Sequence, residues 1–489
     1  MSEARSGAES VRGSQCMVAT GHPLASEAAR RMLRDGGSAV DAAIAADAVL
    51  GVVEPMATGI GGDMLAMVVQ ADGQPVSYNG TGRAPAGLAQ DLVSALPGER
   101  IPERHPYAVT VPGAVRGWRD MHGRFGRLPW ADLFKPAILA ALGGFEVAPV
   151  CAREWSLFAK VLLRDAASSA VYRAGEPPRA GEHYANPQLG RVLQAIATDG
   201  PDAFYRGDPA RAAAANVKAL GGVLDERDFA EHRGFFCTPA STTFRGLTVL
   251  ECPPNTHGVA VLRALDTLEP RPLDPQDPQT FVESVQAMGE ALQWASRTVA
   301  DPAGNTVCTA VVDGDGMAVT LMTSVFKRFG SGIAAPGCGF VLQNRGFGFS
   351  KPGHINGPAP GKRPYHTVVP GAALRDGKFH AVFGVVGGAM QPQGQLQLLL
   401  RIAAWNEVAQ AALDAPRWRL ESETGLAIER GMPDEVVRAL RDAGYVDPTG
   451  AGELGGRSDF GGAQWVMRLP DGALVGASDR RKDGLAAGW

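Results

Sequence analysis

A threonine at the head of a β-rich run is the residue in this sequence best suited to nucleophilic chemistry. Thr306 follows the small, turn-forming pair Gly304-Asn305 and begins segment 306–312, rich in valine, threonine and alanine. If the Asn305–Thr306 bond is cut, Thr306 gains a free α-amine beside its own hydroxyl. That amine, with a pKa of about 8, can take the hydroxyl proton at neutral pH. Nucleophile and base would then belong to one residue.

The segment around Thr306 also has the pattern of a β-hairpin. Residues 306–312 and 317–322 are both β-rich, and the Asp-Gly-Asp-Gly run 313–316 supplies turn residues between them. An ordinary hairpin edge therefore explains this stretch by itself, and other motifs must decide between the two interpretations.

Those other motifs favour the nucleophile, because they resemble, in the same order, the motifs of the γ-glutamyltranspeptidase family. After Thr306 they are FGSGI (329–333), GFVLQNRG (339–346), GKRPYHT (361–367) and GGAMQPQG (387–394). Before it they are HPLAS (22–26), GSAVDAAIAA (37–46), GVVEP (51–55) and GIGG (59–62). The resemblance covers roughly residues 17–489. The run Asn344-Arg345-Gly346 is most similar to the branch with cephalosporin-acylase-like and oxamate-amidohydrolase-like proteins.

The resemblance implies a four-layer αββα sandwich of the N-terminal nucleophile hydrolase type, with two stacked mixed sheets covered by helices, whereas spacing alone indicates only an α/β protein. It also implies one compact unit made of two polypeptides, a large subunit 16–305 and a small nucleophile subunit 306–489. We expect a heterodimer of these fragments, or a dimer of such heterodimers, and a disordered tail over 1–15. The tether before Thr306 is shorter than in most members, which leaves the rate of self-cleavage open.

The composition limits the partners and cofactors. The net charge is −4 with 20% charged residues, and no basic run of the kind that tracks phosphates is present, so we expect no nucleic-acid partner. No apolar run reaches the ~20 residues of a membrane span, so we expect no membrane association. The six cysteines are scattered without a CxxC pair, and no His, Cys or Glu spacing suggests a metal. We expect no metal, no cofactor and a cytoplasmic location.

One glycine cluster, Gly59-Ile60-Gly61-Gly62, invites comparison with a nucleotide-binding loop. The pattern is not G-x-G-x-x-G, and it follows a helix-like segment instead of opening one. Close packing of the backbone is therefore the favoured interpretation.

The resemblance assigns catalytic roles to three further residues. Ser324 matches a position where a threonine hydroxyl hydrogen-bonds the nucleophile, although an ordinary loop serine explains it equally well. Gly387 and Gly388 match paired glycines whose N–H groups form the oxyanion hole. Glycine lets main-chain donors approach a reacting carbonyl without a side chain in the way. The alternative for this pair is a tight turn after the strand 381–386.

Four residues match, or lie near, positions that hold the substrate carboxylate in the family. His366 and Thr367 stand where γ-glutamyl enzymes place two serines. The place where an arginine usually holds the α-carboxylate lies near Thr81, and Arg83 follows two residues later. Histidine is bulkier than serine and titrates near neutrality.

The match is weakest where the family holds the substrate α-amine. Asparagine, glutamine and aspartate usually accept from that ammonium, and Phe326, Arg345 and Gly348 occupy their places here. A buried ammonium facing Arg345 would meet repulsion and no acceptor. Arg83 and Arg345 would instead pair with a carboxylate through two parallel hydrogen bonds. We therefore expect an acyl group with a negative end and no α-ammonium to bind well.

The predicted function is that of a γ-glutamyltransferase-family amidohydrolase that cleaves itself between Asn305 and Thr306. It hydrolyses, or transfers, a γ-glutamyl or similar small acyl group from a small-molecule amide through an acyl-Thr306 intermediate. An acylase for a non-glutamyl amide in specialised metabolism is one alternative. An unprocessed, inactive homologue acting as a binding protein is another, and Thr306 with Gly387-Gly388 argues against it.

Overall fold

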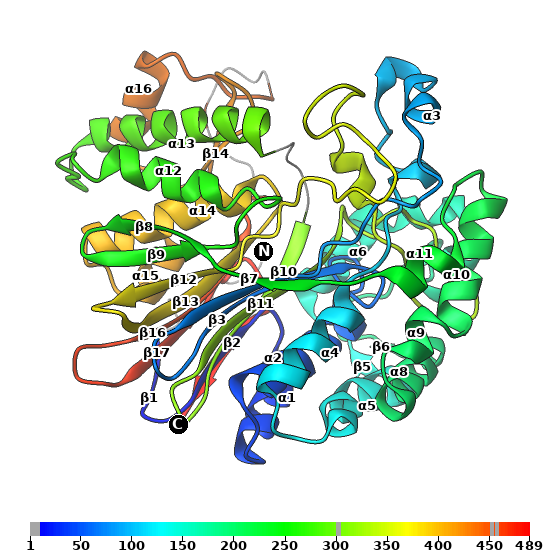
Figure 1. The fold of residues 1–489 in the computed structure, drawn as a ribbon. Helices are drawn as coiled ribbons and strands as arrows, with labels where there is room; N and C mark the ends of the chain where they lie inside the picture. The colour runs from blue at the N-terminus through cyan, green and yellow to red at the C-terminus, as the bar shows by residue number, and fades with distance from the viewer. Residues whose placement is uncertain (1–9, 300–304, 450–453, 455–458) are drawn as a thin grey trace.

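The molecule is built on two seven-stranded sheets that lie face to face, with helices on both outer faces (Figure 1). The computed structural model describes residues 10–299, 305–449, 454 and 459–489. The four-layer αββα sandwich is confirmed. The expectation of mixed sheets is wrong, since all the strand pairings described within them are antiparallel. Short turns join many neighbouring strands, and a short turn can connect only antiparallel partners.

The first sheet carries the predicted nucleophile strand near its centre. Its order is β18 (Leu485–Gly488), β2 (Met17–Thr20), β10 (Asn305–Val312), β11 (Ala318–Phe326), β3 (Asp63–Val69), β4 (Pro75–Asn79) and β7 (Phe235–Cys237). Strands β10 and β11 form the predicted hairpin, with Val312 opposite Ala318 at the turn. At the other end the register shifts between Asn305 and Val307, so the backbone of Thr306 lies at an irregularity in the pairing.

The second sheet includes a strand from the segment expected to be a disordered tail. Its order is β1 (Val11–Gly13), β17 (Leu474–Ser478), β16 (Gly462–Arg468), β13 (Lys378–Val386), β12 (Gly371–Arg375), β9 (Leu247–Glu251) and β8 (Ala240–Phe244). Val11 pairs with Gly476 and Gly13 with Leu474. The prediction of disorder is therefore wrong for 11–13, because β17 offers its free edge to these three residues.

Helices α1 (Pro23–Arg34) and α2 (Ala39–Val53) cover the first sheet. Ser38 starts α2 with a capping box: its Oγ accepts from the Asp41 N–H at 3.1 Å, and Asp41 accepts from the Ser38 N–H at 2.9 Å. All of α2 is buried, and its sequence is apolar on most faces. The second sheet is covered by α12 (Val259–Leu268) and α14 (Met390–Leu399), and α13 (Pro278–Thr298) packs on the outside of α12 (Figure 1).

Shorter helices lie beside the first sheet, on the right in Figure 1. They include α4 (Ala114–Phe125), α5 (Lys135–Gly143), α6 (Pro149–Phe158), α8 (Pro187–Asp199), α9 (Asp202–Tyr205), α10 (Asp208–Ala219) and α11 (Glu226–Glu231). The remaining elements are small: α3 (Gln90–Ser94), α7 (Ala166–Val171), α15 (Ala409–Asp414), α16 (Asp434–Asp442), and the two-stranded pairs β5 (Phe145–Glu146) with β6 (His183–Tyr184) and β14 (Trp418–Leu420) with β15 (Leu426–Ile428).

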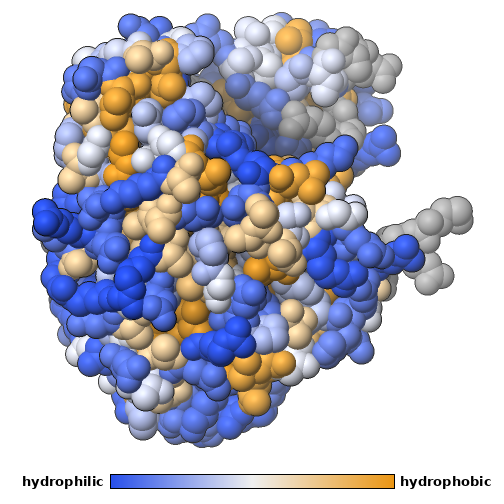
Figure 2. Space-filling model, turned by 90° about the vertical axis from the view of Figure 1, so that its right-hand side faces the viewer, coloured by the Kyte–Doolittle hydropathy of each residue, from blue (hydrophilic) through white to orange (hydrophobic). Residues whose placement is uncertain are grey.

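Three apolar cores hold the layers together. One lies between the sheets and includes Met67, Leu250 and Val382. The other two lie between each sheet and its helices. The face with α10 and α11 is largely hydrophilic, with hydrophobic residues scattered over it and a recess at its upper right (Figure 2). Among the residues described, no helix is both long and apolar enough to cross a bilayer.

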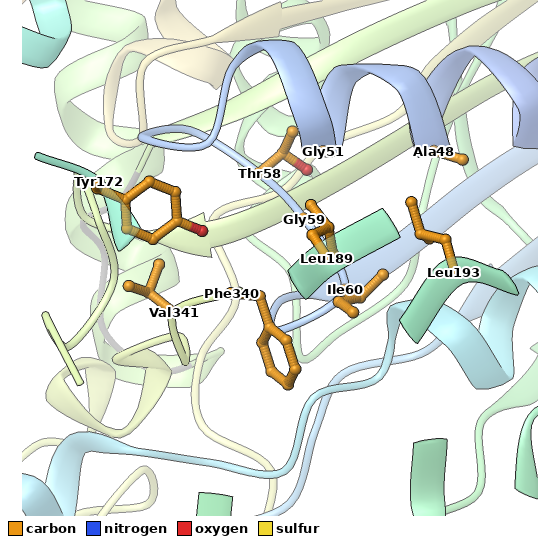
Figure 3. Close-up of a pocket in the computed structure, with 10 residues that line it drawn as sticks. All are labelled: Ala48, Gly51, Thr58, Gly59, Ile60, Tyr172, Leu189, Leu193, Phe340 and Val341. Carbon is orange, nitrogen blue, oxygen red and sulfur yellow. The ribbon is translucent and has the colours of Figure 1, made fainter. Parts of the chain in front are cut away.

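The cluster Gly59–Gly62 packs closely against neighbouring backbone, as expected. A Cβ on Gly61 would lie 2.0 Å from the carbonyl oxygen of Val341, and one on Gly51 of α2 would lie 3.0 Å from the Gly59 Cα. Figure 3 shows Gly59 and Ile60 beside Gly51, around an apolar cavity of about 10 Å³. A space of that size holds at most about one water molecule, so it is no ligand site.

Candidate active site

The candidate nucleophile lies where β10 begins, next to the end of β11. Asn305 pairs with Phe326, and Val307 pairs with Thr323. The side chains of Asn305 and Thr306 are not among those that the structure describes. The cleavage predicted between these residues therefore stays a prediction. Ser324 is buried on β11, and its Oγ accepts from the Phe326 N–H at 2.9 Å. That bond fixes the backbone at Phe326, which has a φ of 77°.

The candidate oxyanion hole lies directly after β13. Gly387 and Gly388 have φ angles of 120° and 63°, which glycine adopts without the strain that a side chain brings. Their carbonyl groups accept from the N–H groups of Met390 and Gln391 at the start of α14. Neither glycine amide donates to any of the described residues. Within the part of the chain that the structure describes, both amides are thus open donors.

Packing between the sheets relates this glycine pair to the nucleophile strand. A Cβ on Gly384 of β13 would lie 2.7 Å from the Cys308 sulfur of β10. Gly387 lies three residues after Gly384, and Thr306 lies two residues before Cys308. The nucleophile strand β10 therefore packs against β13, the strand that the candidate oxyanion hole directly follows.

A buried carboxylate, Asp63, holds the acyl-side residues together. One of its oxygens accepts from the Gly82 N–H and from the Gln343 side-chain amide, both at 2.7 Å. The other lies 3.1 Å from His366 Nε2 and 4.0 Å from Arg345 Nε. Asp63, Arg345 and His366 are each fully buried. Asp63 thus positions two of the candidate substrate-binding residues, His366 and Arg345.

Arg345 lies between a ring, a hydroxyl and this carboxylate. It begins a short 3₁₀ turn (Arg345–Gly348), donates to Thr367 Oγ1 at 3.0 Å, and has its guanidinium carbon 4.0 Å from the Phe326 ring centroid. Burial lowers the Arg345 pKa to about 9, while Asp63 opposes that shift, so the side chain stays charged at neutral pH. Two buried guanidinium nitrogens, Nε and one terminal nitrogen, hydrogen-bond to none of the residues described.

His366 is a neutral, fixed side chain here. Burial, reinforced by Arg345, lowers its pKa to about 4, although Asp63 works in the opposite direction. Nδ1 accepts from the Val368 N–H at 3.2 Å, so Nε2 carries the proton and donates to Asp63. This position therefore supplies no positive charge to a substrate at neutral pH.

The two early residues of the predicted site behave differently from each other. Thr81 is buried, and its Oγ1 accepts from the Asn255 side chain at 3.4 Å. Arg83 is exposed and donates to the Gly361 carbonyl at 2.9 Å. The structure thus brings Phe326, Arg345, His366 and Thr367 together around Asp63, and places Arg83 at the surface.

Asp63 and Asn255 are the site residues that sequence reasoning missed. Asn255 accepts from Asn79 at 2.9 Å and donates to the Pro364 carbonyl at 2.6 Å, which ties the loop after β9 to the segment leading into His366. The signal for Asp63 was available: it is a lone carboxylate between a glycine pair and an apolar strand, 64–69. A charge at the head of a buried strand must have partners.

With this geometry in place, comparison with known proteins identifies the family. The model of the family described as gamma-glutamyltranspeptidase matches residues 25–303 and 296–489. This chain belongs to the γ-glutamyltranspeptidase family. It is therefore an enzyme of the N-terminal nucleophile hydrolase class.

Several relatives within the family match almost the whole chain. The oxamate amidohydrolase proenzyme of Klebsiella pneumoniae is 33% identical, over 97% of this chain and 98% of its own. The glutathione hydrolase-like YwrD proenzyme of Bacillus subtilis is 32% identical, over 98% and 99%. The cephalosporin acylase from Bacillus halodurans has a TM-score of 0.94 and 32% identity, covering 100% of this chain and 98% of that structure. Relatives in this family thus include hydrolases named for different amides.

Proposed function

We propose that the chain cuts itself between Asn305 and Thr306 and then hydrolyses amides of a small acyl group that ends in a carboxylate. The motif order and the proenzyme names of the relatives support self-cleavage. The contact of Arg345 with Phe326 and Thr367 carries the assignment of the acyl group.

In the proposed reaction the Thr306 hydroxyl attacks the amide carbonyl carbon while its proton passes to the Thr306 α-amine. The oxygen that becomes negative accepts from the amides of Gly387 and Gly388. The C–N bond then breaks as the protonated α-amine gives its proton to the leaving amine. Water, deprotonated by the same α-amine, attacks the acyl-Thr306 ester and releases the carboxylic acid.

The acyl group is inferred from what surrounds Arg345. The guanidinium is charged, and its Nε, 4.0 Å from Asp63, and one terminal nitrogen hydrogen-bond to none of the described residues. It therefore fits a carboxylate, to which it can make two parallel hydrogen bonds. An α-ammonium in the same place would face that guanidinium, and the aromatic Phe326 offers no hydrogen-bond acceptor of the kind asparagine supplies. Glutaryl or oxalyl amides are therefore proposed to react at least as well as γ-glutamyl amides.

The test compares kcat/KM for glutaryl and γ-glutamyl 4-nitroanilides, with and without glycylglycine as an acceptor. We expect the glutaryl compound to compete well and glycylglycine to change the rate little. A strong preference for the γ-glutamyl compound, stimulated by glycylglycine, would contradict the proposal and favour a conventional γ-glutamyltranspeptidase.

A further inference from the structure

We propose that a basic pocket beside Gly387 binds the amine half of the substrate and selects amines that carry a carboxylate. This inference rests on the proposed amide hydrolysis and names the second half of the substrate. The pocket has a volume of about 350 Å³. It is lined by Gly387 and Ala389, by residues of α6, and by the segment that follows β11.

The pocket adjoins the acyl-side residues, since Lys327 of its lining lies 5.7 Å from the centroid of the Phe326 ring, but it has a different lining. Its lining includes none of Asp63, Arg345, His366 and Thr367. An amide carbonyl bonded to the Gly387 amide has its acyl chain on one side and its nitrogen on the other. With the acyl chain beside Arg345, the pocket at Gly387 is left for the amine.

The lining of this pocket is strongly cationic. Six lining residues are positive and two are negative: Arg153, Lys327, Arg328, Arg419, Arg481 and Lys482 against Glu154 and Asp459. Two of the cations have carboxylate partners of their own. Arg481 pairs with Glu429 and Asp479, and Arg419 pairs with Asp459 at 2.7 Å.

Among the other four cations, Arg328 and Lys482 have one carboxylate in direct contact, and the buried Glu54 lies within electrostatic reach of both. Glu154 lies 2.6 Å from Arg328 and 3.2 Å from Lys482, so one carboxylate serves two cations. Burial would raise the pKa of Glu154, but these two cations outweigh it and hold the pKa at about 2. Lys327 has Glu103 only at 3.9 Å. Arg153 is exposed and forms no ion pair with a residue that the structure describes.

Arg328 supplies an independent observation that points to a ligand. Its side chain is only 8% exposed, and its Nε and one terminal nitrogen bond to no described residue. A buried guanidinium with open donors is costly unless an acceptor reaches it. A carboxylate on the leaving amine would accept from these donors and lie near Lys327 as well, where the partly buried site strengthens the attraction.

The experiment uses two chromogenic amides with the same acyl group, a 4-nitroanilide and a 3-carboxy-4-nitroanilide. The glutaryl pair and the γ-glutamyl pair are both measured, so the result does not depend on the acyl group. We expect kcat/KM to be about tenfold higher for the carboxylated anilide, equivalent to ~1.4 kcal/mol. That advantage should shrink as salt is raised, because ions screen charges in an open pocket.

Arg153→Gln and Lys327→Gln should each reduce the kcat/KM advantage of the carboxylated anilide several-fold. Arg191→Gln, which removes an exposed arginine on α8, is the matched control and should leave the ratio unchanged. Equal kcat/KM for the two anilides would overturn the pocket assignment and leave the proposed hydrolysis standing. No turnover of either pair by the self-cleaved protein would overturn both.

Discussion

The guanidinium carbon of Arg345 lies 4.0 Å from the centroid of the Phe326 ring. The sequence resemblance predicts that both residues stand where most of the family has acceptors for a substrate ammonium, and here they contact each other. The ring faces a buried cation, and such a contact is worth up to about 2 kcal/mol when desolvated. The two replacements therefore act as a unit, and changing one alone leaves the other without its neighbour.

The first prediction concerns this pair. Arg345→Gln and Phe326→Asn each lower activity on glutaryl 4-nitroanilide, and the double variant shifts the kcat/KM ratio toward the γ-glutamyl compound by about tenfold or more, a change of ~1.4 kcal/mol. The double-mutant cycle should give a coupling energy of about 1–2 kcal/mol. Arg83→Gln is the control, since Arg83 is exposed, and should leave the ratio unchanged. Additive effects of the two changes would contradict the coupling.

The second prediction concerns the oxyanion hole. Gly387→Ala should lower kcat by about 100-fold, on the scale of losing one oxyanion donor. At a φ of 120°, an added Cβ would lie 3.1 Å from the Met390 Cβ and 3.2 Å from the Gly461 Cα, so the amide must move. Gly353→Ala introduces the same kind of strain at φ 86° in open space and should keep full activity. An effect of Gly387→Ala on KM alone would remove Gly387 from this role.

The third prediction is self-cleavage before Thr306. The purified protein should run on a denaturing gel as two fragments, residues 1–305 and 306–489, with the smaller one starting at Thr306 by N-terminal sequencing. Thr306→Ala should run as one band and be inactive, and Thr306→Ser should restore cleavage, because serine keeps the hydroxyl. Full activity from an uncut chain would contradict the mechanism.

The fourth prediction concerns Asp63. Asp63→Asn should lower the free energy of unfolding by about 3 kcal/mol or more, because it leaves the buried Arg345 without a countercharge. It should also lower kcat/KM, since His366 and Arg345 lose the carboxylate that positions them. The matched control is Asp72→Asn in the exposed turn between β3 and β4, where a change within about 0.5 kcal/mol is expected. Urea unfolding measures both variants.

The fifth prediction is a loss of stability between pH 6.5 and pH 4.5. Five histidines have a pKa lowered by burial to about 3 or about 4: His22, His232, His257, His366 and His380. As the pH falls from 6.5, these histidines bind protons in the unfolded chain before they do so in the folded one. Each therefore lowers the free energy of unfolding by about 1.4 kcal/mol per pH unit until its folded pKa is reached.

Buried carboxyls act in the opposite direction over the same range. Burial raises the pKa of Asp47 and Glu54 to about 7 and that of Glu251 well above its ordinary value. Their contribution is present at low pH and is lost as the pH rises toward the folded pKa. The destabilisation from five histidines exceeds the stabilisation from three carboxyls. The urea concentration at the unfolding midpoint should therefore decrease as the pH is lowered from 6.5. His257→Gln should make the fall less steep, and a midpoint that rose on acidification would refute this balance.

Local sequence patterns were enough to predict the elements whose structure is determined by their own residues. The apolar run 38–53 indicates a buried helix, which is α2, and the turn 313–316 predicts the β10–β11 hairpin. Strands β1 and β18 are only three and four residues long and pair with distant strands. Nothing in their own composition distinguishes them from loops.

The sequence indicated which residues belong to the candidate site, but it did not indicate which of them contact one another. Family motifs point to Arg345 and Phe326, but their stacking depends on the positive φ at Phe326 and on the 3₁₀ turn at Arg345. Gln343 donates to Asp63 across 280 positions of sequence. Such contacts follow from how the layers pack, which local spacing does not determine.

The order of the strands has a consequence for what a cut before Thr306 does to folding. Strand β2 lies between β18 and β10, and β1 pairs with β17, so both sheets contain strands from before and from after the cut as direct neighbours. Neither fragment holds a complete core, so each fragment needs the other to keep its fold. The uncut chain refolds as a single molecule at a rate independent of its concentration. Once cut and denatured, it must find a partner, so recovery becomes second order and depends on dilution.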